Sequence, residues 1–150
     1  MIRRKRAVSA AQLGDRRRLL VNVTGLGVWG SGVLWLAFHY FLVRPGQFGP
    51  ERSPLEPWWL KLHGAFAFLA LWTGGLLWGL HVVHGWRMHR RRWSGSLLFG
   101  LFLMLIVSGY LLYYAGDEGP RAVISLVHWV VGLALPLLYL AHRLTRSPTA

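Results

Sequence analysis

The chain has 150 residues, over half of them hydrophobic, with nine Trp but only five carboxylates. This balance excludes an ordinary soluble domain, and the lack of cysteine excludes thiolate-ligated clusters, disulfides and cysteine nucleophiles. The net charge of +12 does not indicate nucleic-acid binding, because the basic residues flank hydrophobic blocks. We expect them to contact anionic lipid headgroups.

Four hydrophobic blocks reach the roughly 20 residues that a helix needs to cross a bilayer. The first block follows a basic segment, residues 1–18, but is too long for a signal peptide, so we expect a retained anchor. We predict an all-α membrane protein, a four-helix transmembrane bundle with a tail at residues 143–150. The predicted helices cover residues 19–43, 58–86, 93–114 and 121–142.

The basic residues predict the orientation of the helices. Thirteen Lys and Arg lie in the N-terminal segment, the second loop and the tail, against four around the first and third loops. Both termini should therefore be cytoplasmic, an N-in/C-in topology. We expect an irregular first loop, residues 44–57, which contains four Pro, and a tight turn at residues 116–120.

Histidines are the main functional signal, because an imidazole in an apolar medium must be paired, hydrated or ligated. With this orientation, His63 and His128 lie near the outer ends of the second and fourth helices. His142 closes the fourth helix on the inner side, where the second helix offers His81 and His84. Two helices thus carry histidines at two matched levels.

Helical spacing refines the pairing. His128 and His142 are 14 residues apart, about 21 Å of rise and within about 40° of one face. His63 and His81 are 18 residues apart, five full turns of an α-helix and about 27 Å. We therefore prefer His81 as the inner partner of His142, with His84 as the competitor.

These histidines favour haem over an all-protein metal site, because no Asp, Glu or Cys lies within the spans to complete one. Haem needs only two axial imidazoles and suits the core of a helix bundle. Gly64 and Gly132 could leave space for the ring, or could simply allow close helix packing. Arg121 could pair with a propionate or mark the membrane edge.

Two further histidines are not expected to be ligands. We interpret His39 as an interfacial cap without an obvious partner and place His89 in the basic inner loop. Quinone contact would need a polar group near a haem edge, and His39, Tyr40, His84 and the tryptophans are candidates.

The third and fourth helices resemble those of bacterial di-haem cytochromes b. The similar stretch begins at Ser108-Gly109-Tyr110 and continues through Leu111-Leu112-Tyr113-Tyr114, Asp117-Glu118, Arg121, His128, Gly132, Pro136 and His142. The resemblance is to the cytochrome b561-like family and related membrane subunits of formate dehydrogenases and nickel–iron hydrogenases. It covers roughly residues 58–142.

The resemblance implies two haems b per chain, each held by two histidines, and electron exchange with quinones in the bacterial cytoplasmic membrane. His63, His128 and His142 match the family's ligand positions. The family often places its fourth ligand at the start of the first helix, where this chain has Arg17, Arg18 and Leu19, so His81 or His84 must supply it here. A protein with one haem remains an alternative.

The leading hypothesis is transmembrane electron transfer between a quinone or quinol and a redox partner protein, as a cytochrome or as the membrane subunit of an oxidoreductase complex. Two histidines leave iron no open position, which argues against oxygen chemistry. The alternative from another class is a cofactor-free membrane adaptor or assembly subunit. An ion transporter is less favoured, because the spans lack a carboxylate relay. A homodimer is possible.

Overall fold

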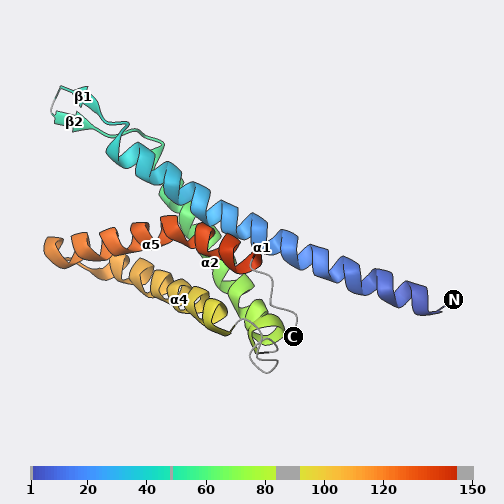
Figure 1. The fold of residues 1–150 in the computed structure, drawn as a ribbon. Helices are drawn as coiled ribbons and strands as arrows, with labels where there is room; N and C mark the ends of the chain where they lie inside the picture. The colour runs from blue at the N-terminus through green and yellow to red at the C-terminus, as the bar shows by residue number, and fades with distance from the viewer. Residues whose placement is uncertain (1, 48, 84–91, 145–150) are drawn as a thin grey trace. The chain divides into compact units, whose positions relative to one another are not determined.

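A computed structural model describes residues 2–47, 49–83 and 92–144, with side chains described from residue 15 onward except at residues 80 and 81. It is almost entirely helical (Figure 1). The elements in chain order are α1 (Ile2–Tyr40), β1 (Arg44–Gly46), β2 (Gly49–Glu51), α2 (Glu56–Leu77), the π-helix η1 (Trp78–Val82), α4 (Arg92–Tyr114) and α5 (Glu118–Leu144).

The described residues contain four helices that are long and apolar enough to cross a membrane, which confirms the prediction of four such helices. The apolar part of α1 is Asp15–Tyr40, but the helix itself begins at Ile2, well before the predicted start at residue 19. Residues 2–18 contain no proline and are rich in Arg and Ala, which favour helix, so the helix can extend through them. The basic segment therefore continues the helical path of the span.

The chain divides into two units, Met1–Leu76 and Leu77–Ala150. In the first unit, α1 and α2 run in opposite directions and meet through side chains. The rings of Phe38 and Trp59 lie 6.0 Å apart near the loop, and the hydroxyls of Thr24 and Thr73 approach to 3.5 Å further along. On α2 the inward positions recur every three or four residues, the interval that defines one face of an α-helix.

The first loop is more regular than predicted. β1 and β2 pair antiparallel, with Arg44 opposite Glu51 and Gly46 opposite Gly49. Gly49 has a φ of +125°, a value that side chains disfavour and that allows the tight reversal. The prolines do not prevent the pairing, because both strands of a two-stranded sheet are edge strands. The prediction of an irregular loop was therefore wrong for residues 44–51.

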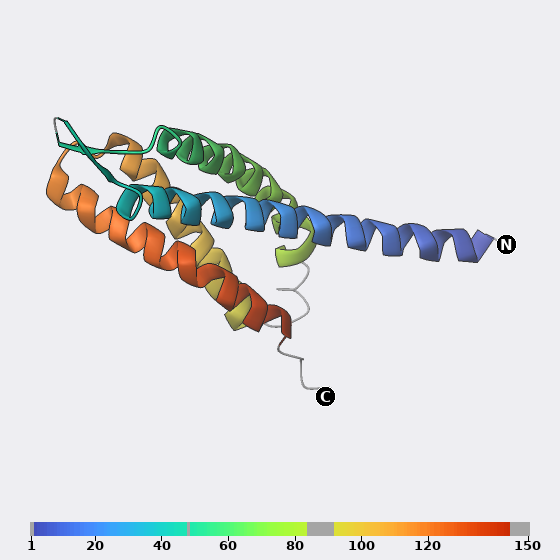
Figure 2. The same ribbon diagram turned by 90° about the horizontal axis from the view of Figure 1, so that it is seen from above.

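In the second unit, α4 and α5 form an antiparallel pair along their length, as both views show (Figures 1 and 2). The connection between them is short, and α5 begins at Glu118 with Pro120 in its first turn, a position where a missing N–H costs nothing. Gly132 of α5 faces Leu105 of α4, whose Cδ2 would lie 3.9 Å from an added Cβ. Of the two roles expected of Gly132, space for a haem ring or close helix packing, this contact fits close packing of α4 and α5.

The second predicted helix departs from α-helical geometry near its inner end. α2 ends at Leu77, and the backbone continues as the five-residue π-helix η1, with hydrogen bonds to the fifth residue back instead of the fourth. One such turn displaces the following residues by about one position, or about 100°, around the axis. The five-turn count that aligned residues 63 and 81 holds only for an uninterrupted α-helix, so periodicity does not choose between His81 and His84.

Burial in the described residues is the reverse of that in a soluble protein. No apolar side chain among them is buried, whereas large apolar side chains on every helix are exposed. In a bilayer the hydrocarbon accepts apolar groups, and polar groups turn towards other helices. The buried residues are Thr24, Ser31, Glu56, Thr73 and Ser108, between 3% and 7% exposed.

Several aromatic side chains lie near the helix ends, where the amphipathic rings of membrane proteins favour the interface. Trp93, Tyr113 and Tyr114 are all at least 70% exposed. Lys61 lies over the ring of Trp58, 4.6 Å from its centroid, where the cation and the aromatic face attract each other.

Gly27 tests the packing of the first unit. A Cβ at this position would overlap the ring of Phe66, so Gly27→Ala should force the ring aside and lower the free energy of unfolding by about 1–3 kcal/mol. Gly25→Ala and Gly30→Ala are matched controls on the same helix, because an added Cβ there meets no described atom within 4 Å. Thermal unfolding in detergent measures the difference, and equal stability of all three variants would contradict this packing.

Candidate functional site

His63 of α2 lies against α1, over a face formed by Val28, Ser31 and Gly32. Its Nδ1–H donates to the Val28 carbonyl oxygen at 2.8 Å, and the Ser31 hydroxyl lies 3.4 Å from the same nitrogen. A carbonyl can only accept, so Nδ1 carries the proton. In the neutral ring the lone pair is then on Nε2.

His128 of α5 is held in a similar way by α4. Its Nδ1 lies 2.8 Å from the Ser108 hydroxyl, which in turn donates to the Leu105 carbonyl at 3.2 Å. In the tautomer with the proton on Nδ1, the Ser108 oxygen accepts from His128 while its own proton goes to the Leu105 carbonyl. In that tautomer the His128 lone pair is on Nε2.

His142, at the other end of α5, lies against the start of α4, where its Nδ1 is 2.8 Å from the Ser94 hydroxyl. Ser94 and Ser108 are 14 residues apart on α4, the same separation as His128 and His142 on α5. Antiparallel helices in register bring such pairs together at both levels. The register therefore holds across Pro136, which lies between the two histidines inside α5.

Sequence analysis missed the serines that contact the histidines. Each is followed by glycine, and the glycines also face the rings: an added Cβ would lie 3.1 Å from His63 at Gly32 and 3.3 Å from His128 at Gly109. At Gly95 the distance to His142 would be 3.9 Å. The signal was available as three Ser-Gly dipeptides, two of them at the spacing of the fourth-helix histidines. They are Ser31-Gly32, Ser94-Gly95 and Ser108-Gly109.

The donor arrangement fits axial ligation of haem. A histidine that binds a metal through one nitrogen usually donates the N–H of the other to a carbonyl, carboxylate or water, which sets the tautomer and the ring orientation. His63 follows this pattern with Nδ1 as donor, and His128 has a serine hydroxyl at the same nitrogen. His63 belongs to the first unit, and His128 and His142 belong to the second.

The other predicted residues are less informative. His81 lies within η1, but its side chain is outside the described part, and His84 and His89 fall outside the described residues altogether. Arg121 donates to the Ala115 carbonyl at 3.2 Å, which places its guanidinium over the connection between α4 and α5. An added Cβ at Gly64 would meet no described atom within 4 Å.

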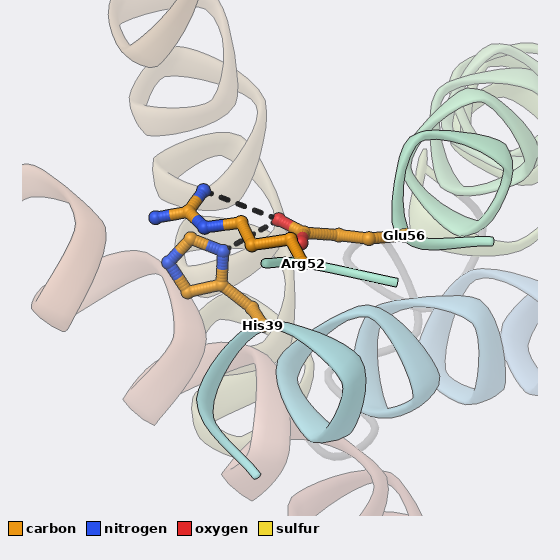
Figure 3. Close-up of polar contacts among 3 residues, drawn as sticks. All are labelled: His39, Arg52 and Glu56. Atoms are coloured by element: carbon orange, nitrogen blue, oxygen red, sulfur yellow. Dashed lines mark hydrogen bonds and ion pairs between the residues drawn. The ribbon is translucent and has the colours of Figure 1, made fainter. Parts of the chain in front are cut away.

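The interpretation of His39 as lacking a partner was wrong. Its Nδ1 lies 2.7 Å from a carboxylate oxygen of Glu56, and Arg52 contacts the same oxygen at 3.4 Å (Figure 3). The ring of Trp35 stacks on His39 at 4.5 Å. His39 and Glu56 are brought together because α1 ends and α2 begins at the same end of the helix pair, a path that the loop sequence does not reveal.

Two buried polar atoms near this cluster make no hydrogen bond within the described part of the chain. They are Oε2 of Glu56, an acceptor, and Nε1 of Trp59, a donor. Glu56 and Trp59 are three residues apart on α2 and therefore lie on the same side of the helix. A molecule carrying both a hydroxyl and a carbonyl group could satisfy both atoms.

No set of three or more metal-binding His, Cys, Asp or Glu side chains occurs among the residues that the structure describes. Haem needs only two protein ligands, so this finding does not bear on it. A comparison with protein-family models, curated proteins and solved structures finds no match. The functional argument therefore depends on the residues and their geometry.

Glu56 should be important for the stability of the first unit. Glu56→Ala removes the partner of His39 from a site where its side chain is 9% exposed, so we expect a loss of about 1–3 kcal/mol. Glu51→Ala is the control, because Glu51 is an exposed carboxylate in β2. Thermal unfolding in detergent tests this, and equal melting temperatures would show that the pair contributes no stability.

Proposed function

We propose that the protein is a membrane cytochrome that binds haem b through paired histidines and transfers electrons across the bilayer. Under this proposal the helices form a four-helix bundle with both termini in the cytoplasm, in a bacterial cytoplasmic membrane. His63 and His128 bind the outer haem, and His142 binds the inner haem together with His81 or His84. His63, His128 and His142 match the ligand positions of the cytochrome b561-like family that the sequence resembles, whereas an inner ligand from His81 or His84 departs from that family's usual arrangement.

The observation that carries the proposal is the matched spacing of α4 and α5. Two histidines, about 21 Å apart along α5, each meet a serine of α4 through Nδ1. Histidines that served only as interfacial caps would need neither a shared spacing nor the same ring nitrogen. Two stacked haems require both, since each needs a ligand of defined orientation at its own depth.

The polypeptide orients the ligand histidines and excludes water from their surroundings. Haem, when bound, supplies an iron that exchanges single electrons between its ferric and ferrous states. Val28 and Ser108 hold the His63 and His128 rings through Nδ1. The exposed apolar side chains on the helices keep the surroundings of the ligands in lipid or protein instead of water.

We further propose that a quinol or quinone binds near Glu56, His39 and Trp59. Oxidation of a quinol to a quinone releases two electrons and two protons, so the site needs proton acceptors as well as an electron acceptor. Glu56 Oε2 can accept a proton from a quinol hydroxyl, and Trp59 Nε1–H can donate to a quinone carbonyl. His63 lies seven residues from Glu56 on α2, about 10 Å along the helix.

A redox partner protein completes the electron path, because the chain has no other predicted electron carrier. The basic segments and tail would lie against lipid headgroups on the inner side. In this orientation the Glu56 cluster lies on the outer side, so protons from quinol would leave outward. The adaptor alternative predicts the same helices without haem.

Haem content tests the central proposal. Purified in mild detergent, the protein should give a dithionite-reduced minus oxidised spectrum of a b-type cytochrome and two haems per chain by pyridine haemochrome assay. His128→Ala and His142→Ala should each lose one of the two, because each removes one axial ligand.

His39→Gln is the matched control, since it removes a histidine that is not assigned to iron, and it should keep both haems. One haem per chain in the unmodified protein would mean that the inner site does not form. No haem, even when a haem precursor is supplied during expression, would contradict the cytochrome and favour the adaptor.

Reduction by quinol tests the proposed quinone site separately. Glu56→Gln keeps the size of the side chain but removes the proton acceptor, so quinol should reduce the haems about 100-fold or more slowly, within the usual range of general base catalysis. Dithionite should still reduce them fully. Glu51→Gln is the control, and an unchanged rate of quinol reduction in Glu56→Gln would place quinone elsewhere.

A further inference from the structure

We infer that Ser31, Ser94 and Ser108, together with Gly32 and Gly109, are positioning residues for the haem-ligand histidines, with Ser108 and Ser94 orienting His128 and His142 and strengthening them as ligands. This inference rests on the proposed function, since it assigns a role to residues that contact the ligands and not the haem. Each serine supplies a hydrogen-bond acceptor for Nδ1. Gly32 and Gly109 leave room for the ring edge beside them, and Gly95 has no such role because it lies farther from its ring.

Ser108 is the best-defined case. It is 7% exposed, and its hydroxyl lies 2.8 Å from His128 Nδ1 and 3.2 Å from the Leu105 carbonyl, so under this inference His128 Nδ1–H donates to Ser108 and Ser108 donates to Leu105. A donated N–H makes the imidazole a stronger electron donor at Nε2. Such a ligand stabilises ferric iron more than ferrous iron, because ferric iron has the greater positive charge.

Ser94 repeats the contact one level away, again at 2.8 Å. The two serines lie at the same separation as the two histidines, so one helix supports both ligands of its neighbour. Ser96, two residues after Ser94, is exposed and makes no hydrogen bond with a histidine among the described residues. Chance contacts between a serine-containing helix and histidines would not be expected to repeat at matching positions.

Ser31 provides a graded comparison. Its hydroxyl donates to the Gly27 carbonyl at 2.6 Å and lies 3.4 Å from His63 Nδ1, which already donates to the Val28 carbonyl at 2.8 Å. The backbone carbonyl cannot be removed by substitution. Loss of the Ser31 hydroxyl should therefore affect its histidine less than loss of Ser94 or Ser108.

The glycines give an independent test. A Cβ at Gly32 or Gly109 would approach the ring of His63 or His128 to 3.1 or 3.3 Å, so the ring must shift by a few tenths of an ångström. At Gly95 the distance would be 3.9 Å, an ordinary contact that requires no shift. Substitution of these glycines by alanine should thus shift the rings of His63 and His128 and leave that of His142 in place.

The experiment compares the two haem midpoint potentials, the low-spin ferric EPR signals and the transfer of haem to excess apomyoglobin. Ser108→Ala should raise the potential of one haem, and Ser94→Ala that of the other, with haem retention about 10- to 100-fold weaker, the usual cost of losing a partner of a metal-bound histidine. Ser108→Thr should restore the potential because it restores the hydroxyl.

Gly32→Ala and Gly109→Ala should both change the EPR signal of the outer haem, since that signal reports the orientation of the imidazole planes.

Ser96→Ala, Gly95→Ala and Gly100→Ala are the matched controls on α4, and Ser31→Ala should have the smallest effect of the three histidine-contacting serines. Helix content by circular dichroism is matched before comparison; if Ser108→Ala does not accumulate, Ser108→Thr and Gly109→Ala decide the result. Haem bound normally, with potentials, EPR signals and retention unchanged in Ser94→Ala and Ser108→Ala, would overturn this inference alone. Lack of haem in the unmodified protein would overturn the proposed function and this inference together.

Discussion

The structure depends on one constraint: a polar group inside an apolar helix must find its partner within the protein. The chain meets it by turning serine, threonine and one glutamate towards a neighbouring helix, while the apolar side chains remain outside. Thr24 and Thr73 approach each other, Ser31 and Ser108 bond to carbonyls of their own helices, and Glu56 meets His39. The histidines contact these same polar residues: His63 contacts Ser31, His128 contacts Ser108 and His39 contacts Glu56.

The histidines and the groups that orient them lie on different helices. His63 is on α2 and His128 and His142 are on α5, and the groups that hold these three rings are on α1 and α4. If the histidines and their hydrogen-bond partners were on the same helix, the imidazoles would be hydrogen-bonded without any contact to a neighbouring helix. Because the contacts are made between helices, the orientation of each ring depends on helix register, and the equal spacing on α4 and α5 maintains that register at both ends.

Block length and composition were enough to predict the four apolar helices, and helical rise was enough to place the histidines at two levels. The π-turn of η1 could not be predicted, because residues 78–82 have the same apolar character whether hydrogen bonds reach back four residues or five. The contact of His39 with Glu56 also lay out of reach, because it depends on the path of a loop, which hydrophobicity does not report. The contact of His128 with Ser108 depends on the rotation of one helix against another, and only the equal spacing of the Ser-Gly dipeptides and the histidines indicates it.

The short connection between α4 and α5 has a consequence for biogenesis. It joins two helices that already hold two histidine rings against serines, so this hairpin can fix both side chains as soon as it inserts into the bilayer. The rotamer freedom of the rings is then lost during membrane insertion. If the protein binds haem as proposed, the polypeptide would accordingly be assembled first and loaded afterwards.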